Sequence, residues 1–406
     1  MGELSQLTVA IIGAGPNGLS IAAHLRSRGI PYRIFGTPVD TWSRHMPAGM
    51  MLKSDGFASN LCGPDGQGTL AAYCAQRGIA YHPTRIAVSL ELFIAYALDF
   101  QQRFVPDVED RQVAAVERAG NGFALRLDGG ETLTADIVIG AVGITHFGQI
   151  PDELAHLPSE LVSHSSAHYD MTALADREVT VVGGGSSAVD LATLLAEGGA
   201  IVSLVARRTA LRFSSPPGEG ERSLWQRLRH PSSGLGPGLR SWLYQKVPHL
   251  FRLLPGDLRL TIIRRHLGPQ TAWLMRERFE SGVTATLGAQ LEKAAEEGGR
   301  VRLAYRTADG VLHEKMTDHI IAATGYRAEV ERLTFLSPDL RSAIRTHAGM
   351  PVLSGVFESS VPNLYFVGPA AVNSFGPLMR FMVGSEYVAP RIARRLARVL
   401  RRTATV

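Results

Sequence analysis

Two glycine-rich turns, each set between a short apolar stretch and a helical stretch, constrain this chain more than any other feature. The first turn follows the apolar segment 8–12, and the second follows the apolar segment 178–182. A strand, a glycine turn and a helix in this order are typical of a dinucleotide-binding unit, whose helix N-terminus offers free N–H groups to a pyrophosphate. Two such units predict two nucleotides, FAD and NADPH, with hydride moving between them. We therefore expect an α/β fold of two Rossmann-like (three-layer ββα/βαβ) dinucleotide-binding domains.

The first turn has six residues that we expect to bind a cofactor: Gly13, Ala14, Gly15, Pro16, Asn17 and Gly18. Gly13 permits the tight turn, Gly15 lets the backbone approach a pyrophosphate, and Gly18 lets helix and strand pack closely. An acidic residue for the ribose hydroxyls is expected at the end of the next strand, but residues 36 and 37 there are glycine and threonine. Asp40 and backbone groups are the alternatives for this contact.

The second turn runs from Gly183 to Ala188, with alanine in place of the third glycine, a change that the motif tolerates. The apolar segment 200–206, which we expect to form the following strand, ends at Arg207 and Arg208. Two guanidinium groups at this position favour the 2′-phosphate of NADPH, and solvated arginines at a strand end are the alternative. The expected nucleotide ligands of this unit are Gly183, Gly185, Ser186, Ser187, Arg207 and Arg208.

Two further apolar strands end in small-residue turns, and they predict where the chain crosses between the units. One ends at Gly143, and the other ends at Thr324, Gly325 and Tyr326. We expect the NADPH domain to be inserted in the FAD domain. The predicted bounds are 1–155 and 322–406 for the FAD-binding domain and 156–321 for the NADPH-binding domain.

A basic, Pro- and Gly-rich insertion at about 212–273 interrupts the second unit and is longer than a crossover requires. The whole chain has a net charge of +5, and basic residues are concentrated in this region. A basic region of this kind fits an anionic membrane surface, a phosphorylated cofactor or nucleic acid. Because no nucleic-acid-binding module is present, we expect no nucleic acid. The aromatic residues here predict a cap over a substrate pocket, and packing of the insertion on its own domain is the alternative.

The remaining composition excludes several classes of protein. Cys62 and Cys74 are the only cysteines and are too far apart for a CxxC motif, so we expect no dithiol relay, no disulfide framework and no metal site. Every apolar stretch is shorter than the roughly 18–20 residues of a membrane span. Only seven residues precede the first strand, which leaves no room for a cleavable signal. These features predict a cytoplasmic protein.

Several motifs together resemble the class B flavin-dependent monooxygenases, which include flavin-containing monooxygenases, amino-acid N-hydroxylases and Baeyer–Villiger enzymes. The motifs are the two glycine turns, the turn 323–326 and the segment 364–368. Residues 45–52 and 164–166 are similar to segments of the N-hydroxylases in particular. The resemblance implies that NADPH reduces FAD and that O2 adds at the flavin C4a carbon. The resulting hydroperoxide would oxygenate a small amine or sulfur nucleophile.

The same resemblance implies site residues in the loop after the first unit, which runs beside the flavin ring in that family. Trp42 and Met51 are the implied flavin contacts. Asp55 and Asn60 are the implied catalytic polar groups, and a loop-capping role is the alternative for Asp55.

Near the C-terminus, Gly368 ends the last strand, and Gly376 with Pro377 is expected to open a helix over 378–402. The positive end of this helix would face the flavin. Arginines follow along it at helical spacing and predict a solvated face, with an anionic surface or a homodimer contact as the alternatives.

The leading hypothesis is therefore an NADPH- and O2-dependent monooxygenase of a small molecule. The alternative is a flavin oxidoreductase that passes electrons to a partner protein or a quinone without oxygen insertion.

Overall fold

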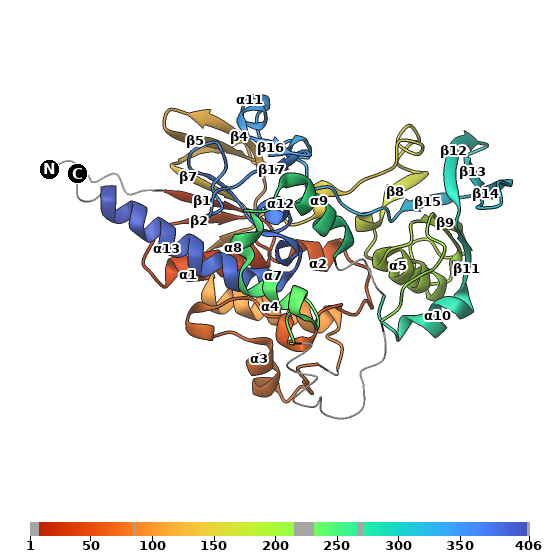
Figure 1. Ribbon diagram of the computed structural model, residues 1–406, viewed down its shortest axis with the longest axis horizontal. Coiled ribbons are helices and arrows are strands. Elements are labelled where there is room, and N and C mark those ends of the chain that lie inside the picture. The colour runs from red at the N-terminus through yellow and green to blue at the C-terminus, as the bar shows by residue number, and fades with distance from the viewer. Residues whose placement is uncertain (1–7, 85, 215–230, 267–270, 404–406) are drawn as a thin grey trace.

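The computed structural model describes residues 8–84, 86–214, 231–266 and 271–403, and these form two lobes that share one plan (Figure 1). The first lobe contains both ends of the described chain, and the second lobe lies at the right of the view. Each lobe is built on a five-stranded sheet.

The sheet of the first lobe has the strand order β18-β7-β1-β2-β3, and all neighbouring strands are parallel. Its central strands are continuous apolar runs because both faces of the sheet are covered. The strands are β1 (Val9–Ile12), β2 (Arg33–Phe35), β3 (Val108–Glu109), β7 (Ile137–Gly140) and β18 (Leu364–Phe366).

Helices cover one face of this sheet, and a small antiparallel sheet covers the other. On the helical face, α1 (Pro16–Arg26) packs against α13 (Ser385–Thr403). The antiparallel sheet contacts β7 through β5. Its strands are β4 (Val113–Ala119), β5 (Gly122–Leu127) and β6 (Thr132–Ala135). Three further helices follow β2 in this lobe: α2 (Asp40–Arg44), α3 (Leu70–Arg77) and α4 (Leu90–Phe104).

The second lobe repeats the arrangement with the strand order β11-β10-β9-β15-β8. Helix α5 (Ser186–Glu197) packs against α10 (Met275–Gly282) and this sheet. Leu303 and Tyr305 of a second antiparallel sheet share a core with Ile320 of the parallel one. The parallel strands are β8 (Val162–His164), β9 (Glu178–Val182), β10 (Ile201–Ala206), β11 (Val283–Leu287) and β15 (His319–Ala322). The antiparallel strands are β12 (Gln290–Glu297), β13 (Arg300–Arg306) and β14 (Leu312–Thr317).

This architecture confirms the expected fold class of two Rossmann-like, three-layer units. The chain leaves the first lobe after β7, builds the second lobe and returns after β15. The strands keep to the expected division of the chain, except that Ala322 closes a strand of the second sheet. The boundaries of the two domains stay a prediction.

The basic insertion is placed differently from the sequence-based expectation. Its described helices are α7 (Leu239–Lys246), α8 (Pro248–Phe251) and α9 (Gly256–Arg265). Both α8 and α9 contact α12 (Val372–Phe375) of the first lobe, and Leu235 is buried in the core of that lobe. Figure 1 shows all three helices in the first lobe. The insertion therefore interrupts the second lobe in sequence but packs on the first lobe in space. Its buried side chains, such as Leu235, are covered by the core of the first lobe.

The C-terminal helix begins later than expected. Gly376 opens a 3₁₀ turn over Pro377–Arg380, and a second 3₁₀ turn covers Met382–Gly384. Between the turns, Phe381 has an extended backbone with φ −120° and ψ 149°, which interrupts the helical path. Helix α13 therefore starts at Ser385, and the expected helix over 378–402 was too long at its N-terminal end.

Candidate active site at the first glycine turn

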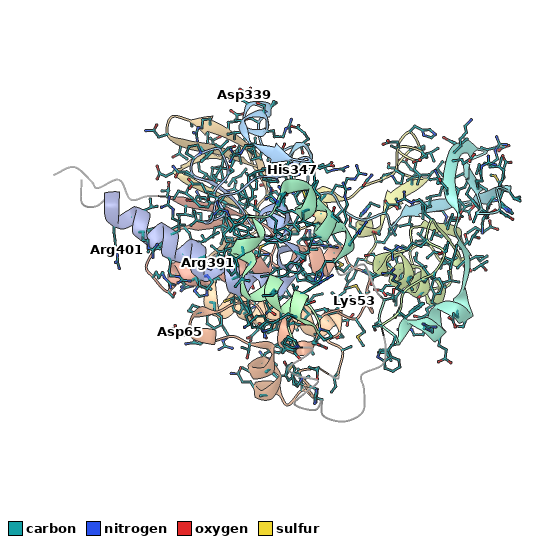
Figure 2. The ribbon with its side chains drawn as sticks, viewed as in Figure 1. Lys53, Asp65, Asp339, His347, Arg391 and Arg401 are labelled. Carbon is teal, nitrogen blue, oxygen red and sulfur yellow. The ribbon has the colours of Figure 1, made fainter. Side chains whose placement is uncertain are left out.

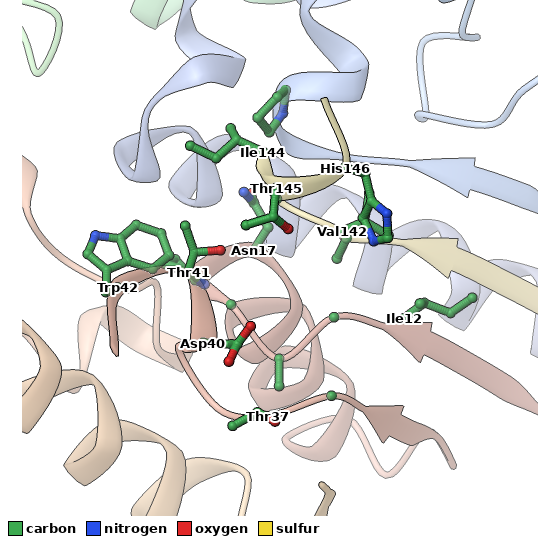
Figure 3. A pocket seen from close by; sticks show the side chains of 18 of the residues that line it. Ile12, Asn17, Thr37, Asp40, Thr41, Trp42, Val142, Ile144, Thr145 and His146 are labelled. Atoms are coloured by element: carbon green, nitrogen blue, oxygen red, sulfur yellow. The ribbon is translucent and has the colours of Figure 1, made fainter. Parts of the chain in front are cut away.

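A pocket of about 280 Å³ lies over the first glycine turn. Its wall includes Gly13 to Asn17, Trp42 and Gly143, all expected from the sequence. Figure 3 shows Thr41 and Trp42 on one segment and Ile144 and Thr145 on another, with the pocket between them. The pocket therefore unites residues from β1, α2 and the turn after β7.

The three glycines of this turn are required for different reasons. A Cβ at Gly13, where φ is +110°, or at Gly18 would come closer than 3.0 Å to a backbone carbonyl. A Cβ at Gly15 would meet no other protein atom nearer than Trp42, at 4.0 Å. Gly13 and Gly18 are therefore needed by the fold itself, whereas the space at Gly15 is open to a ligand.

The start of α1 fits a phosphate group. The helix has no side-chain cap at Gly15 and no acidic residue in its first turn, so its first N–H groups lack a side-chain partner. Asn17 lines the pocket and carries a buried side-chain oxygen with no hydrogen-bond partner, a feature that calls for a ligand. An open helix N-terminus beside an unfilled glycine turn is the arrangement that binds the pyrophosphate of a dinucleotide.

The end of β2 supplies polar groups where the ribose acid was missing from the sequence motif. Thr37 donates its hydroxyl to the Asp110 carboxylate at 2.5 Å. Asp40 lines the pocket, and its carboxylate lies 3.2 Å from Nε2 of His45 and 3.4 Å from Nε of Arg44. One of its oxygens is buried without a hydrogen bond. Asp40 therefore fits the alternative ribose contact that the sequence offered.

Apolar side chains form another part of the pocket wall, and the sequence reasoning missed most of them. Trp42 packs on Phe93 with ring centroids 5.2 Å apart. Met379 lies in the first of the two 3₁₀ turns that replace the expected helix start, and Phe381 lies between the turns. His146 also lines the pocket, and burial lowers the pKa of its imidazole. For Met379 and Phe381 the nearby Gly-Pro pair at 376–377 was the sequence signal, and as a local pattern it predicts a helix start.

The two expected catalytic residues do not line the pocket. Asn60 donates its amide to the Phe57 carbonyl at 2.9 Å and accepts from the Leu70 N–H at 2.8 Å, so it holds the start of α3. Asp55 is exposed, and its backbone carbonyl accepts from Ala58 in a 3₁₀ turn. These contacts give both residues a role in the loop.

Three other expected ligands have structural contacts outside the pocket wall. Met51 forms a backbone bridge with Ser89. A Cβ at Gly368 would meet the Asn17 amide at 3.0 Å, and a Cβ at Gly376 would meet the Phe251 ring at 2.9 Å. The last two glycines therefore permit close packing around the pocket.

The second glycine turn has the same signs of a nucleotide site. A Cβ at Gly183, where φ is +149°, would come closer than 3.0 Å to the Ala323 carbonyl. Helix α5 starts without a side-chain cap or an acidic residue, and the Ser186 hydroxyl is buried without a partner. The stem of Arg208 lies over this turn, 3.2 Å from the position of a Cβ on Gly184. Neither Arg207 nor Arg208 forms an ion pair with an acidic residue among the described ones.

An ion pair joins the two lobes beside the second turn. Lys53, from the loop of the first lobe, pairs with Asp190 on α5, and Figure 2 shows Lys53 between the lobes. The Asp190 side chain is only 3% exposed, and burial raises the pKa of its carboxyl while Lys53 opposes the rise. Asp190 also lines a small cavity of about 20 Å³, together with Tyr326, Ser187 and Met46. Because Met46 lines both cavities, this cavity adjoins the larger pocket.

The turn 324–326 fastens the two crossing segments to each other. Thr324 donates its hydroxyl to the Gln149 carbonyl, and His164 lies 3.1 Å from the Gly325 carbonyl. The His164 ring packs edge-on against Tyr326 at 5.0 Å. Of these three expected ligands, Tyr326 lines the cavity between the lobes, and Thr324 and Gly325 hold the crossing.

Comparison with known proteins decides the family. Residues 10–219, just over half of the chain, match the family described as pyridine nucleotide-disulphide oxidoreductase. The chain belongs to this family. The expectation of an oxidoreductase is thereby confirmed.

Two curated relatives of this oxidoreductase point to different reactions. It is 26% identical over 341 residues to the indole-3-pyruvate monooxygenase YUCCA1 of rice, a match that covers 79% of this chain and 77% of that protein. It is 31% identical over 207 residues to a ferredoxin–NADP reductase of Ignicoccus hospitalis, a match that covers 50% of this chain and 57% of that protein.

Solved structures confirm the resemblance to class B monooxygenases at the level of the fold. The ornithine N-hydroxylase of Kutzneria sp. 744, solved with reduced FAD, NADP+ and L-ornithine, has a TM-score of 0.74 at 15% identity, and the match covers 96% of this oxidoreductase and 98% of that chain. The bacillithiol disulfide reductase of Staphylococcus aureus has a TM-score of 0.64 at 18% identity with the same coverage. The two expected cofactors, FAD and NADP(H), are therefore confirmed as those of this fold.

Proposed function

We propose that this oxidoreductase is an NADPH-dependent flavin monooxygenase that oxygenates a small amine or sulfur nucleophile. The observation that carries the proposal is the position of its two thiols. Neither Cys62 nor Cys74 lines either cavity, although the family includes disulfide reductases. Electrons that reach the flavin therefore have no thiol of this chain as acceptor.

The state of the cysteines supports this conclusion. Cys74 is fully buried. Cys62 lies 3.4 Å from Nε2 of His24, and burial together with Glu386 raises the pKa of its thiol to about 11. A dithiol relay requires a thiolate at neutral pH and a second thiol beside it. Because neither condition is met, the electron acceptor is a molecule from outside the chain, and we propose that it is O2 with a small substrate in the pocket.

The two glycine turns would hold the two cofactors. The open turn at Gly15 and the uncapped start of α1 would bind the FAD pyrophosphate, and Asp40 would bind its ribose. The turn at Gly183 and the guanidinium groups of Arg207 and Arg208 would bind NADPH. Bound FAD supplies hydride acceptance from NADPH and reduction of O2. NADPH, H+, O2 and substrate would then yield NADP+, water and the oxygenated substrate.

The protein's own contribution would be binding and exclusion of water. Trp42, Met379 and Phe381 give the pocket an apolar wall, which keeps water from a reactive oxygen species. His146 is neutral at physiological pH because burial lowers its pKa, so it can accept or donate one hydrogen bond without adding charge. These features support oxygen transfer within the pocket.

The test is to load the purified protein with FAD and measure NADPH oxidation under 18O2 with probe amines and thioethers. We expect at least one probe to stimulate NADPH oxidation and to gain one 18O atom per NADPH. If NADPH oxidation yields only hydrogen peroxide with every probe, oxygen transfer is contradicted.

The sequence similarity to a ferredoxin–NADP reductase favours a second candidate function, which is the transfer of electrons to a partner protein or a quinone. The same preparation distinguishes it under nitrogen. A reductase would reduce ferredoxin or a soluble quinone rapidly with NADPH, whereas a monooxygenase would do so slowly and would require O2 for fast turnover.

A further inference from the structure

The helices of the insertion expose an unusual row of leucines. Five leucines on or beside these helices are more than 40% exposed, and one of them, Leu253, is 74% exposed. Two of them lie one turn apart on α7, at residues 239 and 243. The next two lie on α8 and directly after it, at residues 250 and 253, and the non-helical Val247 separates the two helices. The exposed leucines are Leu239, Leu243, Leu250, Leu253 and Leu258.

Basic residues are interspersed with the leucines. Residues 231–266 hold six basic residues against one acidic residue, Asp257, which gives this segment a net charge of +5. Arg240 and Lys246 are exposed on α7 among the leucines, and Arg252 is exposed between Leu250 and Leu253. The six basic residues are Arg240, Lys246, Arg252, Arg259, Arg264 and Arg265.

The opposite side of the insertion is fixed to the first lobe. Phe251 is buried against Gly376, and Arg259 donates to the Asn373 carbonyl at 2.9 Å. Arg380, which lines the pocket, donates to the Ile263 carbonyl at 3.3 Å. The segment that carries the exposed leucines is therefore packed on the first lobe through other side chains, while the leucines face solvent.

We propose that α7, α8 and α9 form a docking surface for an anionic membrane. Exposed leucines among cations on short helices are typical of segments that lie in the interface, with the apolar side chains in the acyl boundary and the cations at lipid phosphates. No helix among the described residues is long and apolar enough to cross a membrane, so the contact would be peripheral. This proposal does not depend on the reaction proposed above.

The charge of the surface argues against the other occupants. In a two-fold dimer the same basic face would meet itself, and like charges would oppose the contact. A nucleic acid would pair with the cations but would leave the leucines in water. Of these three occupants, an anionic bilayer is the one that satisfies both features.

The test is flotation of the FAD-loaded protein with vesicles of phosphatidylcholine, and with vesicles in which phosphatidylglycerol replaces about a third of it. We expect strong binding to the anionic vesicles, little to the neutral ones, and weakening by salt. The double change Leu250→Ser with Leu253→Ser should lower binding at least ~tenfold, since each removes a side chain that enters the acyl boundary. Leu312→Ser is the matched control, because Leu312 is 49% exposed on β14 of the other lobe.

A second pair of variants tests the charge. Arg240→Glu should lower binding to anionic vesicles at least ~fivefold, at about 1 kcal/mol per cation near the surface. The change is compatible with folding because Arg240 is in the first turn of α7, where an acidic residue is favourable. Lys293→Glu on β12 has the same change in net charge and should have little effect. Unchanged circular dichroism and FAD content would show that the variants fold.

Three outcomes would overturn the proposal. The first is equal binding to neutral and anionic vesicles, and the second is no binding to anionic vesicles at low salt. The third is a protein that sediments as a dimer only while Leu250 and Leu253 are present, which would make this face an interface between copies.

Discussion

At the residue scale, Gly15 and Gly18 belong to the same motif but are glycine for different reasons. A methyl group at Gly15 would meet no protein atom nearer than 4.0 Å, whereas one at Gly18 would collide with the Gly13 carbonyl. The φ of Gly15 is −84°, which any residue can adopt. The first position is therefore reserved for a ligand and the second for the fold.

Gly15→Ala should separate the two effects. We expect the apoprotein to keep its melting temperature, while FAD occupancy falls at least ~tenfold because the methyl group meets the pyrophosphate. Gly18→Ala should lower the melting temperature and the occupancy together. The measurements are the flavin-to-protein ratio and thermal unfolding without FAD. Full FAD loading of Gly15→Ala would make this glycine only a turn residue.

Arg207 and Arg208 have a comparable test at the second turn. Charge-assisted hydrogen bonds are worth roughly 1.5–3 kcal/mol each. Both side chains are at least partly exposed to solvent, which weakens such bonds, so we expect less than the sum of the two contributions. The double change to Ala should therefore raise the KM for NADPH by roughly tenfold to several hundredfold. The KM for NADH should stay nearly unchanged, because NADH has no 2′-phosphate. An equal rise for both coenzymes would give the arginines a general electrostatic role.

Asn60 joins the Phe57 carbonyl in the preceding 3₁₀ turn to the Leu70 N–H at the start of α3, and its removal should lower stability. Asn60→Ala should lower the free energy of unfolding by about 1–2 kcal/mol, because it leaves the Leu70 N–H without its acceptor. Urea denaturation measures this change. A fall in kcat at full FAD loading with no loss of stability would support the catalytic role implied by the resemblance instead.

At the element scale, one ion pair ties the loop after α2 to helix α5. Asp190 is buried, one of its oxygens has no hydrogen bond, and Lys53 supplies its nearest positive charge. The carboxylate in the folded protein therefore depends on a residue of the other lobe. The lobes are linked here by charge as well as by the chain segments that cross between them.

Lys53→Met should make this dependence visible in the effect of pH. Since the pKa of Asp190 is already raised in the folded state, the variant should raise it further, and stability should fall more steeply as pH rises above the usual carboxyl range. We expect the free energy of unfolding to fall by about 1–3 kcal/mol at neutral pH. This is less than for a fully buried pair, because Lys53 is partly exposed. Adding Asp190→Asn should flatten the pH dependence. Urea denaturation at several pH values measures both effects.

At the scale of the whole molecule, a partly buried histidine cluster joins β8 and the turn after it to β15 of the second sheet. The Ser163 hydroxyl lies 2.6 Å from Nε2 of His168 and 2.7 Å from Nε2 of His319. Burial and the neighbouring His319 and His164 lower the pKa of His168 to about 4, and burial also lowers the pKa of His319. The cluster is therefore neutral at physiological pH.

Acidification should destabilise the protein through this cluster. The unfolded chain binds protons near the usual histidine pKa of 6.5, whereas folded His168 does so only near 4. The contribution of neutral His168 to the free energy of unfolding should therefore be full above pH 6.5 and should be lost as the pH falls toward 4. His168→Gln should reduce the slope of the unfolding free energy against pH in this range. The control is His249→Gln, which changes an exposed histidine on α8 and should leave the slope unchanged. Equal slopes in both variants would contradict the prediction.

The sequence by itself determined the two strand–turn–helix units and their order, and it predicted a nucleotide site at each. These features are local: Gly13 and Gly183 need positive φ for tight turns, and apolar runs of this length form buried parallel strands. The fold class and the oxidoreductase family followed from them. The pocket then formed over the first turn, as expected.

Only the tertiary structure decided how distant segments meet. It placed the insertion on the first lobe, started α13 at Ser385, brought Lys53 to Asp190 and used Asn60 to hold α3. No periodicity or residue spacing in the sequence predicts these features. Each of them depends on which buried surfaces fit together and which buried charges find partners. Local pattern therefore determined the units, and long-range packing determined the wall of the pocket over the first turn and the contacts between the lobes.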